Sequence, residues 1–553
     1  LSGGTATAAS GIATFSALRN DKVGNYTLSA SGGSVSTAVA SNSYAITPAA
    51  AAALFFTGQP HTAVAGSNNS PPIVVEARDA FANVATGFTG ASGTVTLGFA
   101  NNAGGGTLAG NSLNAVSGVA TFANVTIDKT GTGYTLNATG TGAITSGASN
   151  PFNITPDVAT KLVFTQDPVT TTAGVTLANV VVKAQDVNSN TATSFTGTVT
   201  LAYANNPGGG GLGGTLITPA VAGVVSFSDL SINVAAANYR LQATSGALTQ
   251  GQSAFFDIDA AAATQLVFTG QPIPQTVAGQ PFRPLGAVVS AEDQFGNVDP
   301  TFTNTITVSR IAGPSQQLFG DSTVAAVAGV ATFTDLTYHT VGTGFTLRAS
   351  FTGLVSGNSN LFDVKAAPAD HLIFSAQPNN AVAGVANSPA ITVTARDQFT
   401  NTDLAFNGGG SGTMSLAINT GSGSIIAGSS AAISNGVATF SNVQIDLVGT
   451  YKLQGSSGAL VTSPLASSSF TISPAGAHHL VFTQQPTTAV GGVSISPSIL
   501  AEARDIFDNT ATGFGGDVTI AISTNPGSGT LSGTATRTAS SGDIGAGAFG
   551  GGM

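Results

Sequence analysis

Apolar and polar residues alternate with a period of two along most of this chain. Residues 391–395 read Ile-Thr-Val-Thr-Ala, and residues 94–99 place Val, Leu and Phe at the odd-numbered positions. Successive side chains of a β-strand point to opposite faces, so this alternation predicts strands with one buried face. The pattern recurs at 199–203 and 414–418. Short strands separated by turn residues predict an all-β fold built of β-sandwiches.

The strand pattern repeats with a period of about 106 residues, the size of one small all-β domain. Each repeat opens with a Leu-x-Phe strand that ends at a proline, and the opening leucines are Leu54, Leu162, Leu266, Leu372 and Leu480. A later Gly-Val-Ala-Thr-Phe strand keeps the same register at 118–122, 329–333 and 436–440, with close variants at 11–15 and 223–227. Phe549 lies near the place expected for the next copy of this phenylalanine. The period therefore predicts tandem domains.

The register of the repeats defines the expected domains. Four complete domains are predicted at 49–156, 157–260, 261–367 and 368–474. Residues 1–48 carry the last strands of a further domain and residues 475–553 carry the first strands of another, so both are predicted to be partial domains. The connections between domains have a constant length and often contain proline, which predicts stiff spacers and an extended rod.

A tyrosine near the start of a late strand is the most specific structural motif. Tyr26 precedes Leu28 by two residues, and the same positions recur as Tyr134, Tyr239 and Tyr451 and as Leu136, Leu241, Leu347 and Leu453. In the fourth copy Phe345 replaces the tyrosine. The motif resembles the tyrosine corner of immunoglobulin-like (Ig-like) domains, in which a cysteine follows at the position held here by leucine. We expect these residues to be structural, with an apolar side chain in place of a disulfide.

An Asp-x-x-x-Asn motif follows an apolar strand in every repeat. The pairs are Asp79 and Asn83, Asp186 and Asn190, Asp293 and Asn297, Asp397 and Asn401, and Asp505 and Asn509. Asp and Asn side chains bond their own backbone and tolerate left-handed geometry, so the motif predicts a turn. The alternative is a calcium loop, with these acids and amides as ligands near the domain junctions. Calcium takes about six to eight oxygens, so one such pair would need further ligands.

Charge and composition exclude several classes of function. Charged residues make up 7% of the chain and its net charge is −10, without a Lys/Arg cluster, so no nucleic-acid partner is expected. The sequence contains no cysteine, which removes disulfides and thiolate metal sites. It also lacks an apolar run long enough to span a membrane. A mean hydropathy of +0.29 argues against disorder.

Chemistry-bearing motifs are scarce. The histidines do not recur in register: His61, His339, His371, His478 and His479. Residues 208–213 fit the Gly-x-Gly-x-x-Gly spacing, but a β-segment follows instead of the helix that a phosphate site needs. We therefore predict no enzyme, no catalytic residue and no cofactor-binding residue, with calcium as the single cofactor alternative.

Three motifs together resemble tandem bacterial Ig-like domains, of the invasin/intimin-like type found in large surface or extracellular proteins. They are the Val-x-Ala-Arg-Asp-x-Phe-x-Asn turn, the Gly-Val-Ala-Thr-Phe strand and the Gly-x-Tyr-Thr-Leu strand. The resemblance covers essentially the whole chain. It implies an extracellular or cell-surface location and a role as a stalk.

The expected function is that of a structural protein, either a stiff stalk or a filament subunit. If residues 475–549 of one copy are completed by residues 1–47 of the next, copies of the chain would assemble head-to-tail. The competing interpretation is that both ends are arbitrary cuts in a longer repeat protein. The alternative function is a surface adhesin that engages a glycan or protein ligand through exposed, glycine-rich loops.

Overall fold

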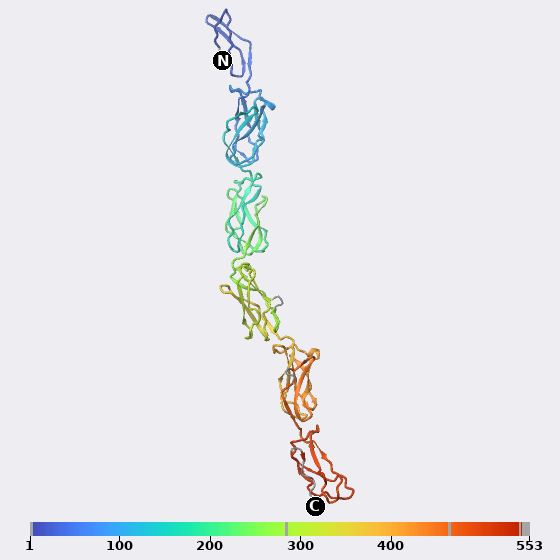
Figure 1. Ribbon diagram of the computed structural model, residues 1–553. Coiled ribbons are helices and arrows are strands. Elements are labelled where there is room, and N and C mark those ends of the chain that lie inside the picture. The colour runs from blue at the N-terminus through green and yellow to red at the C-terminus, as the bar shows by residue number, and fades with distance from the viewer. Residues whose placement is uncertain (1–3, 283–285, 463–465, 541–542, 545–553) are drawn as a thin grey trace. The chain divides into compact units, whose positions relative to one another are not determined.

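The computed structural model describes residues 4–282, 286–462, 466–540 and 543–544; Phe549 lies outside these residues. The described chain consists of short β-strands and turns with two 3-10 helices, and it contains no α-helix (Figure 1). It divides into two units, Leu1–Ala261 with Phe295–Asn297 and Ala262–Gln294 with Val298–Met553. The predicted all-β fold of tandem Ig-like sandwiches without disulfides is confirmed.

In the first unit, an N-terminal segment precedes two complete domains. The segment contains β1 (Gly24–Tyr26), β2 (Ser29–Gly32), β3 (Val35–Ala40) and β4 (Tyr44–Ile46). The first complete domain contains β5 (Ala53–Gly58), β6 (Ala63–Val64), β7 (Ile73–Arg78), η1 (Gly90–Gly93), β8 (Thr94–Asn101), β9 (Leu108–Ala109), β10 (Ser112–Asn114), β11 (Val119–Phe122), β12 (Thr126–Ile127), β13 (Gly131–Gly140), β14 (Ile144–Thr145) and β15 (Phe152–Thr155). The second contains β16 (Lys161–Gln166), β17 (Thr171–Thr172), β18 (Val180–Gln185), β19 (Thr198–Asn205), β20 (Leu212–Gly213), β21 (Ile217–Pro219), β22 (Val224–Phe227), β23 (Ser231–Ile232), β24 (Ala236–Thr244), β25 (Gly251–Gln252) and β26 (Phe256–Asp259).

Two sheets enclose the core of the first complete domain. One has the order β11-β7-β5, and the other has the order β10-β8-β13-β15-β6, antiparallel except for the β15–β6 pair. Leu54 and Val75 from the first sheet join Leu97 and Leu136 from the second in one buried cluster. Burying such an aliphatic side chain contributes about 1.5–3 kcal/mol. The second domain repeats this arrangement around its own cluster.

The second unit holds two further complete domains and a C-terminal segment. The third domain contains β27 (Gln265–Gly270), β28 (Gln275–Val277), β29 (Ala287–Glu292), β30 (Thr305–Ala312), β31 (Thr323–Ala325), β32 (Val330–Phe333), β33 (Gly342–Ser350), β34 (Gly357–Asn358) and β35 (Phe362–Lys365). The fourth contains β36 (His371–Ala376), β37 (Ala381–Val382), β38 (Ile391–Arg396), η2 (Gly408–Gly410), β39 (Thr413–Thr420), β40 (Ile425–Ala427), β41 (Ser430–Ser434), β42 (Val437–Phe440), β43 (Gln444–Ile445), β44 (Gly449–Ser457), β45 (Leu460–Val461) and β46 (Phe470–Ser473). The segment contains β47 (His479–Gln484), β48 (Leu500–Arg504), β49 (Asp517–Thr519), β50 (Thr536–Thr538) and β51 (Asp543–Ile544).

The third and fourth domains each have a separate buried cluster. The third keeps the two-sheet topology of the first unit's domains. In the fourth, β41 pairs with both β42 and β39, which joins the two sheets at one edge. The C-terminal segment has a small core of Ala501, Val518 and Ala539. Its sheets are β47-β48-β51 and β49-β50.

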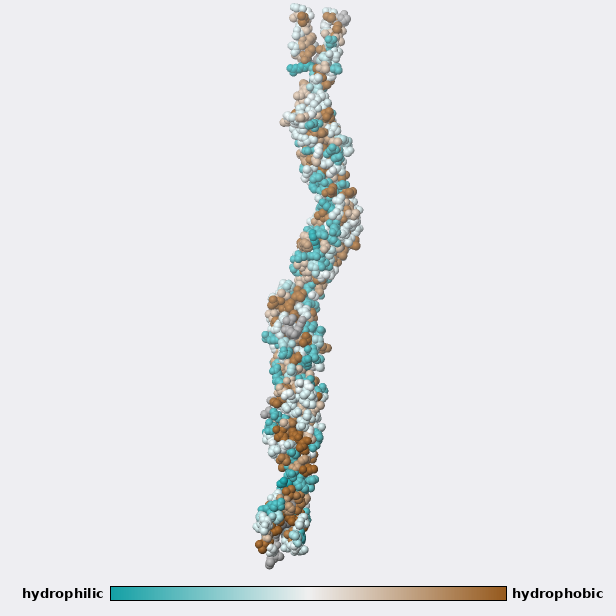
Figure 2. All heavy atoms as spheres, turned by 90° about the vertical axis from the view of Figure 1, so that its right-hand side faces the viewer, coloured by the Kyte–Doolittle hydropathy of each residue, from teal (hydrophilic) through white to brown (hydrophobic). Residues whose placement is uncertain are grey.

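On the face drawn in Figure 2, hydrophilic (teal), weakly polar (white) and apolar (brown) residues are interspersed. This matches a sequence in which Thr, Ser, Asn and Gly replace charged residues. Within the described ranges, no helix is long and apolar enough to cross a membrane.

Candidate functional site

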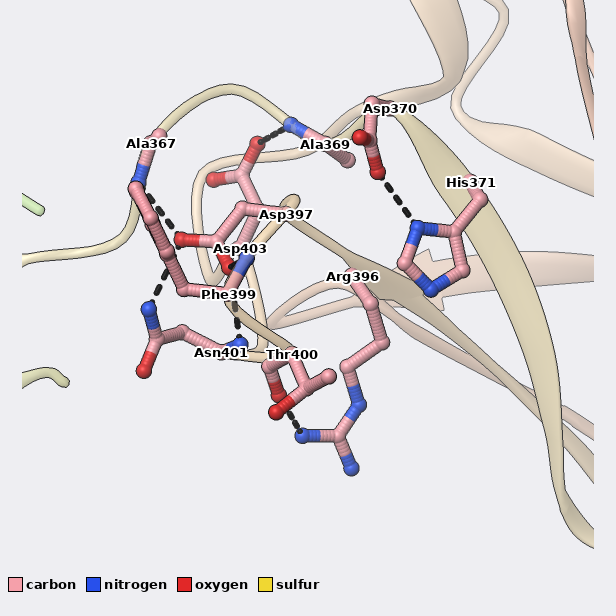
Figure 3. Close-up of polar contacts among 10 residues, drawn as sticks. All are labelled: Ala367, Ala369, Asp370, His371, Arg396, Asp397, Phe399, Thr400, Asn401 and Asp403. Atoms are coloured by element: carbon pink, nitrogen blue, oxygen red, sulfur yellow. Dashed lines mark hydrogen bonds and ion pairs between the residues drawn. The ribbon is translucent and has the colours of Figure 1, made fainter. Parts of the chain in front are cut away.

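The Asp-x-x-x-Asn turn of the fourth domain is built around a buried carboxylate, shown in Figure 3. Asp397 Oδ1 accepts hydrogen bonds from the backbone N–H groups of Phe399 (2.9 Å) and Asn401 (2.8 Å). Its Oδ2 accepts from the Asn401 side chain (2.8 Å) and from the N–H of Ala367 in the preceding linker (3.0 Å). Thr400 adopts a left-handed conformation. Asp397 thus fixes both the turn that follows it and the linker that enters its domain.

The asparagine of this turn reaches out of its own domain. The Asn401 side-chain amide donates to the backbone oxygen of His339 (2.7 Å), and its Oδ1 accepts from the N–H of Val341 (3.1 Å). Both partners belong to the loop before β33 of the third domain. An asparagine amide carries a donor and an acceptor on one plane, so it pairs with the chain much as a neighbouring strand would. We call this pair of hydrogen bonds the asparagine clip.

The asparagine clip recurs at other junctions within each unit. At each one, the amide donates to a backbone oxygen of the preceding segment or domain, and the side-chain oxygen accepts from an N–H two residues later. The oxygen acceptors and N–H donors are Asp21 and Val23 for Asn83 (2.8 and 3.2 Å), Asp128 and Thr130 for Asn190 (2.9 and 3.1 Å), and Asp446 and Val448 for Asn509 (2.7 and 2.9 Å). The accompanying aspartate accepts from the linker N–H of Ala49, Asp157 or Ala475. In the third domain, the corresponding aspartate, Asp293, is fully buried. The corresponding asparagine, Asn297, immediately precedes Val298, which forms an isolated β-bridge with Glu292.

Beside the asparagine clip, an aromatic ring packs against a glycine of the preceding domain. A Cβ added to Gly279 would lie 2.5 Å from the Phe399 ring, and one added to Gly384 would lie 2.4 Å from the Phe507 ring. Each glycine ends the Val-Ala-Gly turn of its domain. Only a residue without a side chain leaves room for so close an approach. The ring and the asparagine clip therefore fix the same junction at two points.

The junction of the third and fourth domains carries an additional aromatic stack. The His339 ring lies between Phe319, at a centroid distance of 3.8 Å, and Phe399, at 4.3 Å. Beside it, Arg396 Nη1 donates to the Thr400 backbone oxygen (2.6 Å). A groove of about 1050 Å³ opens at this junction, lined in part by Gln275, Val277, Arg396, Phe399 and Leu404.

Hydrogen bonding sets the ionisation of the turn carboxylates. The bond from the Asn83 side chain is the main cause that lowers the pKa of Asp79 to about 2. Burial works in the opposite direction at Asp505, but the hydrogen bonds from Asn509 and from the Ala475 N–H still hold the pKa of that carboxyl below its ordinary value. These groups are therefore charged at neutral pH, and a charged acceptor strengthens each bond it receives.

The calcium interpretation finds little support in this geometry. Each oxygen of Asp397 already faces two N–H donors, which occupy the lone pairs that a cation would need. In the part of the chain that the structure describes, no group of three or more His, Asp or Glu side chains could hold a metal ion. The donors favour the turn interpretation, while calcium binding itself stays a prediction to be tested.

The predicted tyrosines and leucines of the four complete domains lie in the domain cores. The hydroxyls of Tyr134, Tyr239 and Tyr451 donate to the backbone oxygens of Lys129, Val234 and Leu447, each at 2.8 Å. Burial raises the pKa of all three tyrosines. Leu136, Leu241, Leu347 and Leu453 are fully buried, whereas Tyr26 and Leu28 of the N-terminal segment are half-buried.

The sequence predicts the Asp-x-x-x-Asn turn but not the contact that its asparagine makes with the preceding domain. The motif predicts a local turn, yet its asparagine bonds residues about 60 positions earlier. The constant linker length was the available signal, because a fixed linker brings the same two loops together at every junction.

Comparison with known proteins finds similar solved structures but no related sequence. No protein-family model and no curated protein matches the sequence. Similar solved structures include the protocadherin gammaB4 extracellular domain, with 13% identity over 94% of this chain and 84% of that chain and a TM-score of 0.23. The Sidekick-1 immunoglobulin domains 1–5 match with 12% identity over 84% and 90% and a TM-score of 0.20. The D00-D0 domain of intimin matches with 9% identity over 37% and 98% and a TM-score of 0.21.

Proposed function

We propose that this chain is a structural spacer, a stalk or filament segment of the extracellular or cell-surface kind, in which consecutive Ig-like domains are held at fixed junctions. The observation that carries the proposal is the asparagine clip, which recurs with the same two hydrogen bonds at Asn83, Asn190, Asn401 and Asn509. The proposal includes the domain boundaries given above, the absence of a cofactor and of enzymatic activity, and the invasin/intimin-like type.

The physical argument concerns the freedom of the junctions. Domains joined by a linker alone move relative to one another by default. Each hydrogen bond of the asparagine clip contributes about 0.5–1.5 kcal/mol net, and the clip acts together with the linker bond to the aspartate and, at two junctions, with a ring on a glycine. Several such contacts at each junction restrict bending and twisting. A spacer requires this restriction at every junction, whereas an enzyme requires one specialised site.

Electron microscopy of the full chain tests the proposal. The comparison is between wild type and a variant with Asn83→Ala, Asn190→Ala, Asn401→Ala and Asn509→Ala together. We expect the angles between neighbouring domains within each unit to spread more widely in the variant, while its β-content by circular dichroism is unchanged. Equal angular spread in the two proteins would refute a spacer role for the asparagine clip.

Head-to-tail joining of copies is the finer part of the proposal, and apolar exposure on the terminal segments supports it. Phe15 is 41% exposed, whereas its equivalent Phe122 is 1% exposed; Leu480 is 50% exposed, against 1% for Leu54. Covering a large apolar side chain gains about 1.5–3 kcal/mol. We propose that the N-terminal segment of one copy covers the C-terminal segment of a second copy.

A surface adhesin is the second candidate, favoured by the groove at the junction of the third and fourth domains. Leu404 and Arg396 both line this groove, and Leu404 is 67% exposed. An apolar floor with a few polar groups is typical of binding sites. The adhesin and the spacer can be distinguished by screening the full chain and its Leu404→Asp variant against a glycan array. A ligand lost on this substitution would favour the adhesin.

A further inference from the structure

The groove at the junction of the third and fourth domains is lined by two basic residues of a chain that has few. The sequence contains 15 Lys and Arg residues among 553. Two of them, Lys365 at the end of β35 and Arg396 at the end of β38, line this one groove. Its volume of about 1050 Å³ lies at the upper end of the range for small-ligand sites, about 300–1000 Å³. The groove is therefore large enough for a ligand that meets both cations.

Arg396 lacks the acidic partner that arginines at the same position of other repeats have. Those arginines each pair with a glutamate two residues earlier, on the same face of the strand. The pairs are Arg78 with Glu76 at 2.8 Å and Arg504 with Glu502 at 3.2 Å. In the fourth domain the glutamate is replaced by Thr394, which cannot neutralise a guanidinium. Within the described ranges, neither Arg396 nor Lys365 forms an ion pair.

The Arg396 side chain is held in place and keeps unused donors. Its Nη1 donates to the backbone oxygen of Thr400 at 2.6 Å, which fixes the guanidinium beside the turn (Figure 3). In the described chain this is the only hydrogen bond that the guanidinium makes. A guanidinium carries five N–H donors in a planar fork, a geometry that matches the two oxygens of a carboxylate. Arg396 is thus positioned for a carboxylate that its own domain does not supply.

The two carboxylates that line the groove are bonded to the backbone. Asp403 accepts from the N–H groups of Ala405 through Oδ1 and Ala369 through Oδ2, both at 3.0 Å (Figure 3). Asp363 Oδ1 accepts from the N–H of Gly344 at 2.9 Å. Neither aspartate forms an ion pair with a basic residue of the groove among the residues that the structure describes. The charged donors of the groove therefore remain available to an anionic ligand.

The strand edge at this groove disfavours a peptide as that ligand. β28 is the end strand of its sheet and contributes to the lining of the groove. Its outer backbone groups are partly used, since the Ile273 N–H donates to the Phe282 oxygen at 3.0 Å. The Gln280 N–H likewise donates to the Val277 oxygen at 3.0 Å. Residues 280–282 thus lie along this edge, and an extended peptide could not add a full strand there.

The remaining lining suits a saccharide. The hydroxyls of Thr340, Thr343 and Thr400 line the groove and make no hydrogen bond in the described chain. A hydroxyl both donates and accepts, as the hydroxyls of a sugar do. Leu404, which is 67% exposed, offers an apolar surface to the C–H face of a sugar ring. A sugar that also carries a carboxylate would match the hydroxyls, the apolar side chain and the two cations together.

We infer that this groove binds an acidic saccharide, with one sugar carboxylate on Arg396, a second on Lys365 and a sugar ring against Leu404. The inference rests on the adhesin candidate given above and adds the chemical class of its ligand. Charged hydrogen bonds of this kind discriminate strongly, because a ligand without the carboxylate leaves the guanidinium unpaired. The site belongs to this junction alone among the repeats with an arginine before the turn, since Arg78 and Arg504 are already paired with glutamates.

Calorimetric titration of the full chain with trigalacturonate, a soluble acidic saccharide, tests the inference. We expect the neutral methyl ester of the same saccharide to bind at least about tenfold more weakly. Arg396→Gln should weaken the binding of trigalacturonate about tenfold to a hundredfold, because the charged hydrogen bonds are lost. Arg348→Gln is the control, since Arg348 is an exposed arginine of the third domain that does not line the groove; we expect wild-type affinity there.

A second variant restores the ion pair of the other repeats. Thr394→Glu places a carboxylate where Glu76 and Glu502 pair with their arginines. We expect it to weaken the binding of trigalacturonate as much as Arg396→Gln does, although it removes no group from the groove. Circular dichroism of both variants should match wild type.

The outcomes separate the ligand class from the adhesin candidate beneath it. If wild type binds no saccharide on the glycan array or by calorimetry, the adhesin and this inference both fail. If it binds neutral saccharides but no acidic one, or if both variants in the groove keep wild-type affinity in folded form, the ligand class alone is overturned. Equal binding of trigalacturonate and a triglutamate peptide would also overturn the saccharide class, because the carboxylates alone would then account for the affinity.

Discussion

The side-chain amide of Asn401 lies 2.7 Å from the backbone oxygen of His339, a residue 62 positions earlier in the chain. One planar group thereby satisfies a carbonyl and, through Val341, an N–H of the preceding domain. An aspartate at the same place would offer no donor, and an alanine would offer neither group. The asparagine therefore serves two purposes, closing its own turn and holding the junction.

The packing of the Phe399 ring against Gly279 can be tested by substituting this glycine. Gly279→Ala adds a Cβ 2.5 Å from the ring at a φ of +76°. Gly344→Ala is the matched control, since Gly344 has a φ of +73° and nothing within 4 Å of an added Cβ. Both variants bear the strain of positive φ, about 1 kcal/mol. We expect Gly279→Ala to cost about 1–3 kcal/mol more, measured by hydrogen exchange of junction peptides.

A rescue variant completes that test. Adding Phe399→Ala to Gly279→Ala removes the clash, so hydrogen exchange at the junction should slow again toward the level of Phe399→Ala alone. Equal costs for Gly279→Ala and Gly344→Ala would show that the ring does not depend on the glycine.

Two neighbouring tyrosines of the second domain provide a controlled test of the tyrosine corner. Tyr239 and Tyr203 have ring centroids 5.7 Å apart. The Tyr239 hydroxyl donates to Val234, whereas the buried Tyr203 hydroxyl has no hydrogen-bond partner in the described chain. Tyr239→Phe should lower the free energy of unfolding of this domain by about 1–2 kcal/mol, because the Val234 oxygen loses its bond. Tyr203→Phe should be neutral or stabilising. Urea titration followed by hydrogen exchange of second-domain peptides measures both, and equal effects would contradict the account.

Low pH should destabilise the first complete domain, because Asp79 becomes protonated. Its pKa is about 2 in the folded protein, below the ordinary value of 3.8, so its contribution to stability is present above pH 4 and is lost as the pH falls toward 2. Limited pepsin digestion over this window, with the fragments assigned by mass spectrometry, reports the loss. Asp79→Asn should flatten the pH dependence of cleavage in this domain, whereas a substitution of the exposed Asp21 by Asn should not. An unchanged pH profile in Asp79→Asn would rule this cause out.

Calcium removal should leave the chain unaffected. The carboxylate oxygens of Asp397 already receive four N–H donors, so a cation would have to displace them. We expect the same melting temperature in EDTA and in millimolar calcium chloride. A rise in melting temperature with calcium that disappears in Asp397→Asn would restore the calcium-loop hypothesis.

The sequence was sufficient for the fold because the fold depends on repeated side-chain patterns. The period-two alternation and the leucine after each tyrosine mark positions that are buried in the structure, such as Leu136 and Leu241. Tyr134 and Tyr239 bond back to the chain as a tyrosine corner requires. These features are local in sequence or depend on one apolar side chain.

The asparagine clip could not be predicted in the same way, because its partners are backbone groups. Any residue supplies a carbonyl and, except for proline, an N–H. The asparagines bond the backbone oxygens, and not the side chains, of Asp21, Asp128, His339 and Asp446. The side chains of the preceding loop therefore do not specify this contact, and it becomes visible only when neighbouring domains are seen together.

The most direct test of the central claim is hydrogen exchange at the Val341 amide in wild type and in Asn401→Ala. This N–H donates to Asn401 Oδ1, so a junction held by the asparagine clip predicts exchange about tenfold faster in the variant, equivalent to about 1.4 kcal/mol. The Val448 amide, held by Asn509, should keep its wild-type rate, as should Val341 in a variant of the exposed Asn419. Unchanged exchange at Val341 would mean that the domains are not fastened through this asparagine.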